Sequence, residues 1–386
     1  MVAGPILCWD RNVRQLSSAS LLVLHLCGLP AFAGQAYQYD QEPVAWESYE
    51  TMWLKDLPIA SASEPIRAHY SESKALAFAS NVALKWSRQN QCGTCHTNIA
   101  YLMARPLLPG AASDPIQHEV REHAEEYLNN PFSEPIEFLP FLIATTASAL
   151  AINDALTDGT FDPKVRSLFE QLWKIQNAGG SWDYPVDTTV PFLERNKYYV
   201  PLFVALALGY IPGQYYATPE ARDGFAKLQG FLRTHMPDNH HEHAVLLWAS
   251  ARTPGLLTEA QRDQFTHELL DLQNADGGWT LPALGQWARH DGIPNDPEGP
   301  SDGYATALVT TALCQAQTGL HDTAINKSIH WLKSHQRVSG QWFTASLYSN
   351  RFHNYLSNMA TSYALMALKS CEQGATPAVT WTNPKR

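Results

Sequence analysis

Hydrophobic and polar positions along the chain follow a helical period, and two kinds of helical segment alternate. The first kind is amphipathic, with one apolar and one polar face. Such segments are expected at approximately 73–88, 115–128, 163–177, 219–235, 258–274 and 323–336. The second kind is apolar nearly all round and rich in Ala, Leu and Thr. These segments are expected at approximately 96–108, 136–152, 197–208, 240–251, 303–317 and 358–370.

Helices that are apolar all round must be enclosed by other helices. The six apolar segments are therefore predicted to form an inner ring, and the six amphipathic segments an outer ring. No segment with the two-residue period of a strand is long enough to compete. The expected fold is all-α, an (α/α)6 toroid. In two of the outer helices, Pro163 and Pro219 are expected at the first helical position.

One seven-residue pattern, Q-x-x-x-G-x-W, occurs three times, each time after an amphipathic segment and before a loop. Its copies are QNAGGSW at 176–182, QNADGGW at 273–279 and QRVSGQW at 336–342. We expect each Gln to cap a helix end and each Trp to pack under the turn that the Gly permits. A degenerate fourth copy begins at Gln89, with Cys95 in the place of the Trp.

The beginning of the chain is typical of an export signal, because two Arg residues precede an apolar run at 21–29 and an Ala-Phe-Ala sequence follows it. We therefore expect a signal peptide at 1–33, an N-terminal extension at 34–70, the toroid at 71–372 and a C-terminal tail at 373–386. The protein would be periplasmic or secreted. The apolar run is too short to span a membrane, and no later segment is expected to do so.

Composition describes a large, acidic, globular protein. The chain of 386 residues is 45% hydrophobic, which is enough for a sizeable core. Its formal net charge is −10, and no basic cluster interrupts that excess of acidic residues. Nucleic acid and anionic membrane surfaces are therefore disfavoured as partners.

The strongest chemical motif is C-x-x-C-H, formed by Cys92, Cys95 and His96. Thiols at this spacing can add across the vinyl groups of a haem, with the adjacent imidazole as an iron ligand. The expected cofactor is a c-type haem that is covalently bound at Cys92 and Cys95. A protein with such a haem could exchange electrons with a redox partner. A tight disulfide is the alternative, whereas zinc would need two more ligands. Cys314 and Cys371 are most simply buried core thiols, and a disulfide between them is open.

A family resemblance lies in the Q-x-x-x-G-x-W segments and in the apolar helices GYATALVTTAL and ATSYALMAL. These residues resemble the prenyltransferase/squalene oxidase repeats of squalene-hopene cyclases and of the wider terpenoid cyclase and protein prenyltransferase superfamily. The segment LQNADGGWTLPALGQWARHDG, together with C-x-x-C-H-T, resembles an exported bacterial branch of squalene-cyclase-like proteins. The resemblance covers about 73–370 and implies a toroid with a cavity for an apolar ligand. This chain is long enough for one such barrel, and it lacks the D-x-D-D run that supplies the acid of the cyclases.

In such a ring the inner helices all run the same way, so their N-termini converge on one face. Unpaired N–H groups and positive dipole ends there favour an anion. The residues expected on that face are Cys92, Cys95, His96, Asn98, Glu137, Glu194, Arg195, Tyr198, His240, His241, Glu242, His243, Asp302, Tyr304, Asn354 and Asn358. A loop with Arg289, His290 and Asp291 is interpreted as part of a lid or as a surface loop held by Trp279 and Trp287.

The sequence HHEH at 240–243 is the second strongest feature. His240 and His243 share a helical face and can chelate a metal ion, or one of them can be the distal ligand to a haem iron carried by His96. The expected metal ligands are therefore His96, His240 and His243. Alternatively, the histidines are solvated or pair with Glu242.

The expected catalytic residues are Asp302, Glu194, Tyr198 and Tyr304. Both carboxylates lie at inner-helix starts with a Tyr nearby, and burial beside aromatic rings would raise the pKa so that one stays protonated as an acid. Otherwise Glu194 pairs with a neighbouring cation, and Asp302 simply caps its helix.

Aromatic residues are abundant, with 12 Trp, 16 Tyr and 14 Phe. Rings that line a cavity can stabilise a carbocation, and the same rings equally suit an ordinary core. The leading hypothesis is an exported toroid enzyme for an apolar isoprenoid or lipid-like small-molecule substrate, of cyclase, isomerase or haem-dependent type. The alternatives are a haem-carrying electron-transfer or sensor protein without turnover, and a carbohydrate-active toroid hydrolase or lyase.

Overall fold

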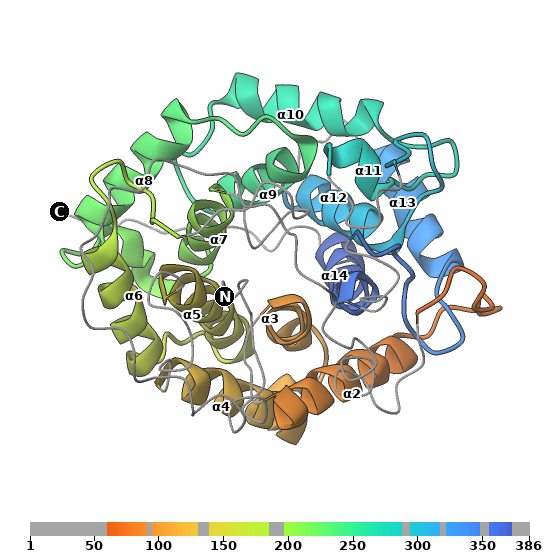
Figure 1. The fold of residues 1–386 in the computed structure, drawn as a ribbon, viewed down its shortest axis with the longest axis horizontal. Helices are drawn as coiled ribbons and strands as arrows, with labels where there is room; N and C mark the ends of the chain where they lie inside the picture. The colour runs from red at the N-terminus through yellow and green to blue at the C-terminus, as the bar shows by residue number, and fades with distance from the viewer. Residues whose placement is uncertain are drawn as a thin grey trace, which may run out of the picture.

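The computed structural model describes residues 60–90, 95–129, 139–184, 197–287, 294–316, 322–347 and 355–372. In this part of the chain the expected all-α fold is confirmed, because two concentric rings of helices form an (α/α)6 toroid (Figure 1). The outer helices are α2 (Glu72–Asn90), α4 (Pro115–Asn129), α6 (Pro163–Ile175), α8 (Arg222–Thr234), α10 (Glu259–Asp271) and α13 (Asp322–Ser334). The inner helices are α3 (Cys95–Ala104), α5 (Leu139–Thr157), α7 (Tyr199–Leu208), α9 (His240–Ser250), α12 (Gly303–Ala316) and α14 (Tyr355–Glu372).

Short helices lie in the connections between the rings. They are η2 (Arg105–Leu107), η3 (Ala111–Ser113), η6 (Pro212–Ala217) and α11 (Leu281–Leu284). The signal peptide expected at 1–33 and the tail expected at 373–386 lie outside the described residues.

The inner helices are buried on all sides, as their apolar composition predicts. Every residue of Val200–Leu208 in α7 and of Gly303–Gln315 in α12 is buried. The outer helix α6 buries a single stripe formed by Val165, Phe169 and Leu172. Packing of apolar faces therefore decides which ring a helix joins.

One inner helix, α5, is the sole described helix that is long and apolar enough to cross a membrane. This differs from the expectation that no segment after the signal peptide would qualify. Most of its surface is buried inside the protein, where α3, α6 and α7 pack against it. The enclosed helix of a large ring meets the same criteria of length and composition as a membrane span.

Two predicted helix starts have different outcomes. The outer helix α6 begins at Pro163, and the Asp162 carboxylate caps it by accepting a hydrogen bond from a backbone amide at 2.7 Å. The prediction for Pro219 is wrong, because α8 begins at Arg222. The chain first makes a tight turn, in which the Thr218 carbonyl accepts the amide three residues later at 3.2 Å.

Each Q-x-x-x-G-x-W segment follows an outer helix and links the end of that helix to the start of the next outer helix. Each Gln side-chain amide donates one hydrogen bond to the Gly carbonyl of its own turn, so it holds the turn that follows the outer helix and not the helix end itself. It donates a second hydrogen bond to a carbonyl at the start of the next outer helix. These second bonds run from Gln176 to Gly224 at 3.0 Å, from Gln273 to Ala324 at 2.9 Å and from Gln336 to Ser71 at 3.0 Å.

The Trp of each segment is buried under the turn, as expected. Its indole N–H donates to a carbonyl in the last turn of the preceding outer helix, where carbonyls have no partner within the helix. These bonds run from Trp182 to Leu172 at 2.8 Å, from Trp279 to Leu269 at 2.6 Å and from Trp342 to Leu332 at 2.8 Å.

Two constraints require glycine in these turns. Gly180 and Gly340 have φ of 91° and 106°, in the left-handed region. A Cβ atom at these positions would lie 2.1 Å and 2.3 Å from the carbonyl oxygens of Lys227 and Lys74. Glycine therefore allows both the turn and its close approach to the next outer helix.

The last of these segments closes the ring on the beginning of the described chain. The Ser71 amide donates to Gln336 Oε1 at 2.8 Å, and the Gln336 amide group donates back to the Ser71 carbonyl. Residues 60–70 run beside the same turn, where Ile66 and Arg337 form an antiparallel bridge. This part of the expected N-terminal extension belongs to the closure of the toroid.

Cys314 and Cys371 form a disulfide that joins the inner helices α12 and α14. The sequence allowed either two buried thiols or a disulfide at these positions, and the structure contains the disulfide. The disulfide lies toward the C-terminal ends of both helices, away from the N-terminal face where the site was expected.

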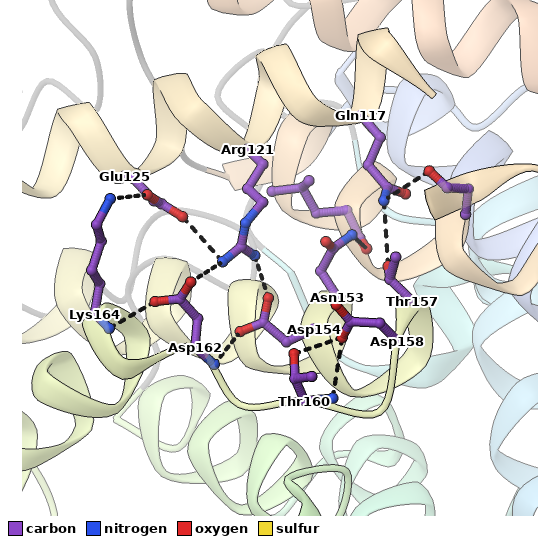
Figure 2. Close-up of polar contacts among 12 residues, drawn as sticks. Gln117, Arg121, Glu125, Asn153, Asp154, Thr157, Asp158, Thr160, Asp162 and Lys164 are labelled. Carbon is purple, nitrogen blue, oxygen red and sulfur yellow. Dashed lines mark hydrogen bonds and ion pairs between the residues drawn. The ribbon is translucent and has the colours of Figure 1, made fainter. Parts of the chain in front are cut away.

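A polar network joins α4, α5 and α6 at the C-terminal end of α5 (Figure 2). Its centre is Arg121 of α4, whose Nη1 lies 2.6 Å from Asp154 Oδ1 on α5 and whose Nη2 lies 3.0 Å from Glu125 Oε1. Asp154 also accepts the Asp162 amide at the start of α6, at 3.1 Å. Burial raises the pKa of Asp154 to about 6, although the Arg121 charge opposes the rise.

The substitution Arg121→Met should lower the free energy of unfolding by about 2 to 4 kcal/mol near neutral pH, because it leaves the Asp154 carboxylate buried without its cation. The Asp154 carboxylate takes up a proton as the pH falls through about 6. Urea denaturation should therefore show a smaller loss in mildly acidic than in mildly alkaline buffer. The ordinary pKa of Asp154 is 3.8, so between about pH 4 and pH 6 the folded state binds a proton at Asp154 that the unfolded state has lost. The free energy of unfolding of the wild type should therefore fall as the pH rises through this range.

The matched control is Lys164→Met, which removes an exposed cation of the same network. It should change the free energy of unfolding by less than about 0.5 kcal/mol. Equal losses in the two variants, or a loss in Arg121→Met that does not depend on pH, would contradict the assignment of Asp154 as the buried charge.

Replacing Cys314 and Cys371 together with Ala should lower the free energy of unfolding by about 4 kcal/mol, because the disulfide closes a loop with a sequence separation of 57. Urea denaturation of the oxidised protein and of the variant measures the difference. Reducing agent should bring the wild type to the level of the variant. Wild-type stability that is insensitive to reduction would show that the cross-link does not form.

Candidate functional site

A small pocket lies at the centre of the toroid and is enclosed by four inner helices. Its lining residues are Tyr199, Leu202, Phe203 and Leu206 of α7, His241, Glu242, Val245 and Trp248 of α9, Tyr304 of α12 and Tyr363 of α14. We call this space the central pocket. Its volume of about 20 Å³ is room for a water molecule. The wall is largely aromatic and aliphatic, and it carries one carboxyl group.

That carboxyl group belongs to Glu242, in the first turn of α9. The Asn239 side chain caps this helix by accepting the Glu242 amide at 2.9 Å. Glu242 is 4% exposed, and its Oε2 is buried without a hydrogen-bond partner. Burial raises the pKa of Glu242 to about 8, against the lowering effects of the Asn239 side chain and of the Lys197 charge. The group can therefore hold a proton inside an apolar pocket near neutral pH.

His241, Tyr304 and Tyr363 form a hydrogen-bonded row across the same pocket. His241 Nε2 and Tyr304 Oη are 2.9 Å apart, and Tyr304 is hydrogen-bonded in turn to Tyr363. Burial lowers the pKa of His241 to about 3 and raises the pKa of Tyr304 well above its ordinary value. Both groups are therefore neutral. Tyr304, which was expected to be catalytic, lies in this pocket.

A larger pocket lies beside the first, at the N-terminus of α9 and next to α11. It is lined by residues 238–240, 282–287, 295 and 297, and its volume is about 820 Å³. We call this space the mouth pocket. Trp287 lines it, and the Trp287 ring also contacts the ring of His241 at a centroid distance of 5.8 Å. Trp287 therefore lines the mouth pocket and contacts a residue that lines the central pocket.

The HHEH sequence is divided between two faces of α9, because successive residues on a helix do not face the same way. His241 faces the central pocket, whereas His240 and His243 face the outer helix α10. There the Nδ1 atoms of His243 and His240 lie 2.9 Å and 3.7 Å from Glu268 Oε2. The carboxylate beside these histidines is therefore Glu268 and not Glu242.

The expected combination of His96 with His240 and His243 stays a prediction, because the His96 side chain lies outside the described residues. The helix α3, in which His96 is the second residue, lies across the ring from α9 and packs against α2, α5 and α14 (Figure 1). His240 and His243 instead meet Glu268 on the outer ring. Cys92 and the side chains of Cys95 and His96 lie outside the described residues, so the haem stays a prediction.

Asp302 caps the inner helix α12 and uses both carboxylate oxygens to do so. Oδ1 accepts hydrogen bonds from the Tyr304 and Ala305 amides and from Thr344 Oγ1, each at 3.0 Å. Oδ2 accepts the Leu281 amide at 2.5 Å. Burial raises the pKa of Asp302 to about 6, and these hydrogen bonds limit the rise. The arrangement matches the capping interpretation, and Asp302 lines neither of the two pockets.

Tyr198, which was expected to be catalytic, faces outward and lines neither of the two pockets. Its hydroxyl donates to the Met236 carbonyl at 3.3 Å, and its ring contacts Phe231 of α8. The next residue, Tyr199, lines the central pocket instead. Glu194 and the loop at 289–291, which was interpreted as a lid, lie outside the described residues and stay predictions.

Glu242 was expected on the N-terminal face of the ring but was not named as an acid. It is a lone carboxylate in the first turn of an otherwise apolar inner helix, and this pattern is the signal for its burial in the pocket. Glu268 carried no such signal, because its contact with His243 depends on how α9 packs against α10. The same holds for Trp287 and its contact with His241.

No protein-family model and no curated protein matches the sequence. Among solved structures, a protein from Actinoplanes is similar with a TM-score of 0.47 at 17% identity, over 78% of this chain and 100% of that chain. A variant of the type II terpene cyclase MstE from Scytonema, in complex with its substrate geranylgeranyl dihydroxybenzoate, has a TM-score of 0.47 at 15% identity, over 78% and 97%. The apo form of MstE has a TM-score of 0.46 at 15% sequence identity, over 77% of this chain and 97% of that chain. At these values the assignment of the site depends on its geometry alone.

Proposed function

We propose that this protein is an exported toroid enzyme that protonates an apolar, alkene-containing substrate of isoprenoid or lipid-like kind, with Glu242 as the acid. The observation that carries the proposal is the burial of the Glu242 carboxyl group among aromatic rings, with one oxygen left without a partner. Such surroundings solvate a carboxylate poorly, so Glu242 keeps its proton near neutral pH and meets a substrate in the acid form.

The groups of the central pocket can supply each part of this reaction. Transfer of the Glu242 proton to an alkene carbon forms a C–H bond from the π electrons and leaves a carbocation on the neighbouring carbon. The rings of Tyr199, Phe203 and Trp248 line the same space and can stabilise that charge by cation–π attraction. Loss of a proton to the Glu242 carboxylate then completes a cyclisation or an isomerisation and restores the acid.

The volumes of the two pockets limit where each part of such a substrate can lie. A space of about 20 Å³ cannot hold an isoprenoid chain, whereas the mouth pocket of about 820 Å³ has the size of a ligand site. The proposal therefore places the body of the substrate in the mouth pocket and its reacting double bond at Glu242. Trp287 lines the mouth pocket and contacts His241 of the central pocket, so in this proposal its ring moves aside when the substrate binds.

A carbohydrate-active enzyme is less well supported by the same site. Hydrolysis of a glycosidic bond generally uses a pair of carboxyl groups on opposite sides of the bond. Glu242 is the sole carboxyl group among the described residues that line the central pocket.

The substitution Glu242→Gln should abolish proton transfer to the substrate. Purified protein is incubated with squalene or a shorter polyprenyl hydrocarbon in D₂O, and deuterium in the recovered hydrocarbon is measured by mass spectrometry. The wild type should introduce deuterium with each turnover. The variant keeps the shape of the side chain but lacks the acidic proton, so incorporation should fall by a factor of about 100 or more.

The matched control for this experiment is Glu259→Gln, at an exposed position in the first turn of α10. It should incorporate deuterium at the wild-type rate. Trp287→Ala should retain incorporation and accept bulkier alkenes, because it removes a ring that lines the mouth pocket and contacts His241. Incorporation that is unchanged in Glu242→Gln, or absent from the wild type with every alkene, would refute Glu242 as the acid.

The c-type haem and the export of the chain are separate proposals. The disulfide between α12 and α14 supports an oxidising compartment, such as the periplasm or the extracellular space. When the protein is produced with a haem-attachment system, it should absorb in the Soret region and gain the mass of one haem. Cys92→Ala should remove both signals, whereas the double variant Cys314→Ala, Cys371→Ala should keep them. A colourless protein of unmodified mass would refute the haem proposal and the electron-transfer alternative.

A further inference from the structure

His240, His243 and Glu268 form a cluster that is separate from the central pocket. Two of its members lie on the outward face of α9 and the third lies on the outer helix α10. Their nearest ligand atoms all lie within 4.8 Å of one another. We infer that this cluster binds one divalent transition-metal ion, with Zn²⁺ as the best match. The inference is independent of the chemistry proposed for Glu242.

The distances within the cluster suit a four-coordinate ion. The Nδ1 atoms of His243 and His240 lie 2.9 Å and 3.7 Å from Glu268 Oε2. Zinc bonds to imidazole nitrogen and carboxylate oxygen are about 2.0 to 2.2 Å long, and tetrahedral geometry then separates neighbouring ligand atoms by about 3.3 to 3.5 Å. Movements of a few tenths of an ångström would bring both nitrogen–oxygen distances to this range, and the two histidine nitrogens already lie within 4.8 Å of each other.

Neighbouring groups already orient two of the three ligands. The His243 Nε2 atom lies 2.9 Å from the Pro237 carbonyl, which requires an N–H at Nε2 and leaves Nδ1 directed at the cluster. The Gln264 amide donates to Glu268 Oε1 at 2.8 Å, which leaves Oε2 for the ion. Hydrogen bonds of this kind, from a ligand to a backbone carbonyl or to a second side chain, are regular features of metal sites.

The His243 ring is also held in place by stacking. It lies parallel to the ring of Phe265 on α10, with a centroid distance of 3.9 Å and an interplanar angle of 9°. A ligand with a fixed ring plane loses little conformational freedom when a metal ion binds. The geometry of the site is thus largely set by the packing of α9 on α10.

The third ligand has an atom that lacks a partner. His240 Nδ1 is buried without a hydrogen bond, and its 3.7 Å distance to Glu268 is too long for one. Buried polar atoms without a partner are rare in proteins. A metal ion between His240 and Glu268 would satisfy this nitrogen.

The donor set selects among cations. Two imidazole nitrogens and one carboxylate oxygen suit zinc and similar transition metals, whereas magnesium and calcium prefer oxygen ligands. Three protein ligands leave a fourth position for water or another small ligand, as in zinc sites that are open to solvent. His240 also lines the mouth pocket, so the cluster adjoins that space.

Zinc binding is tested on the full-length chain after removal of metals with EDTA. Isothermal titration calorimetry with ZnCl₂ should show one saturable site at this cluster, and MgCl₂ should not produce it. The variant Cys92→Ser, Cys95→Ser should retain the site, because the thiols of the C-x-x-C-H motif are not among its ligands. Excess zinc should also raise the thermal unfolding midpoint of the wild type.

Substitutions in the cluster identify the ligands. His240→Ala and Glu268→Gln should each weaken zinc binding by at least about tenfold, and Gln264→Leu by about tenfold or more through its effect on Glu268. The matched control is His267→Ala, an exposed histidine on α10 whose ring bonds its own helix, which should bind as the wild type does. The side chains of His240 and Glu268 are partly exposed, so both variants should fold, and thermal unfolding without metal verifies this.

Two results would overturn the inference. The first is the absence of saturable zinc binding by the wild type and by the cysteine variant. The second is zinc binding with unchanged affinity in both His240→Ala and Glu268→Gln, which would place the ion elsewhere. If one of these variants does not fold, the affinity of the other decides between the outcomes.

Discussion

The fold depends on two hydrogen bonds from a single amide group, the side-chain amide of Gln in each Q-x-x-x-G-x-W segment. One bond holds the turn at the end of an outer helix, and the other reaches the start of the next outer helix. The Gly of the segment makes the approach possible, and the Trp satisfies a carbonyl at the end of the first helix. Apolar inner helices can be buried only if the outer helices stand side by side around them, and these joints set that spacing for three neighbouring pairs: α6 with α8, α10 with α13, and α13 with α2.

Enclosure by the ring also determines the chemistry available inside it. The same loss of water that stabilises α9 as an inner helix keeps a carboxyl group protonated at Glu242 and an imidazole neutral at His241. One residue beyond Glu242, a rotation of about 100° around the helix axis, His243 faces the outer ring and meets a carboxylate and a backbone carbonyl. A single stretch of four residues thus serves two environments, because the surface of a helix faces the axis on one side and the outer ring on the other.

The fold could be predicted largely from the sequence, whereas the site could be predicted only in part. Burial on all sides and burial of one stripe leave different patterns in the sequence, so α7 and α6 were assigned to the correct rings. The two Pro-based helix starts had similar signals, yet the Asp162 side chain caps its helix, whereas the Thr218 hydroxyl bonds the Tyr215 carbonyl before it and a local turn precedes α8. Contacts such as Glu268 with His243 arise from the packing of two helices and leave no local pattern. Tyr198 and Tyr199 differ only in the direction of their side chains, which the position of the helix start decides.

The joint at which the ring closes is chemically equivalent to the joints within the chain. Gln336 bonds Ser71 at the beginning of the described chain as Gln273 bonds Ala324 of the next helix, and Lys369 of the last helix pairs with Glu72 of the first at 2.6 Å. The toroid therefore has no unique first helix. A circularly permuted chain, with its present ends linked and its new ends in another connection, would contain the same set of joints. The order in which the helices leave the ribosome is thus independent of the forces that hold them in a ring.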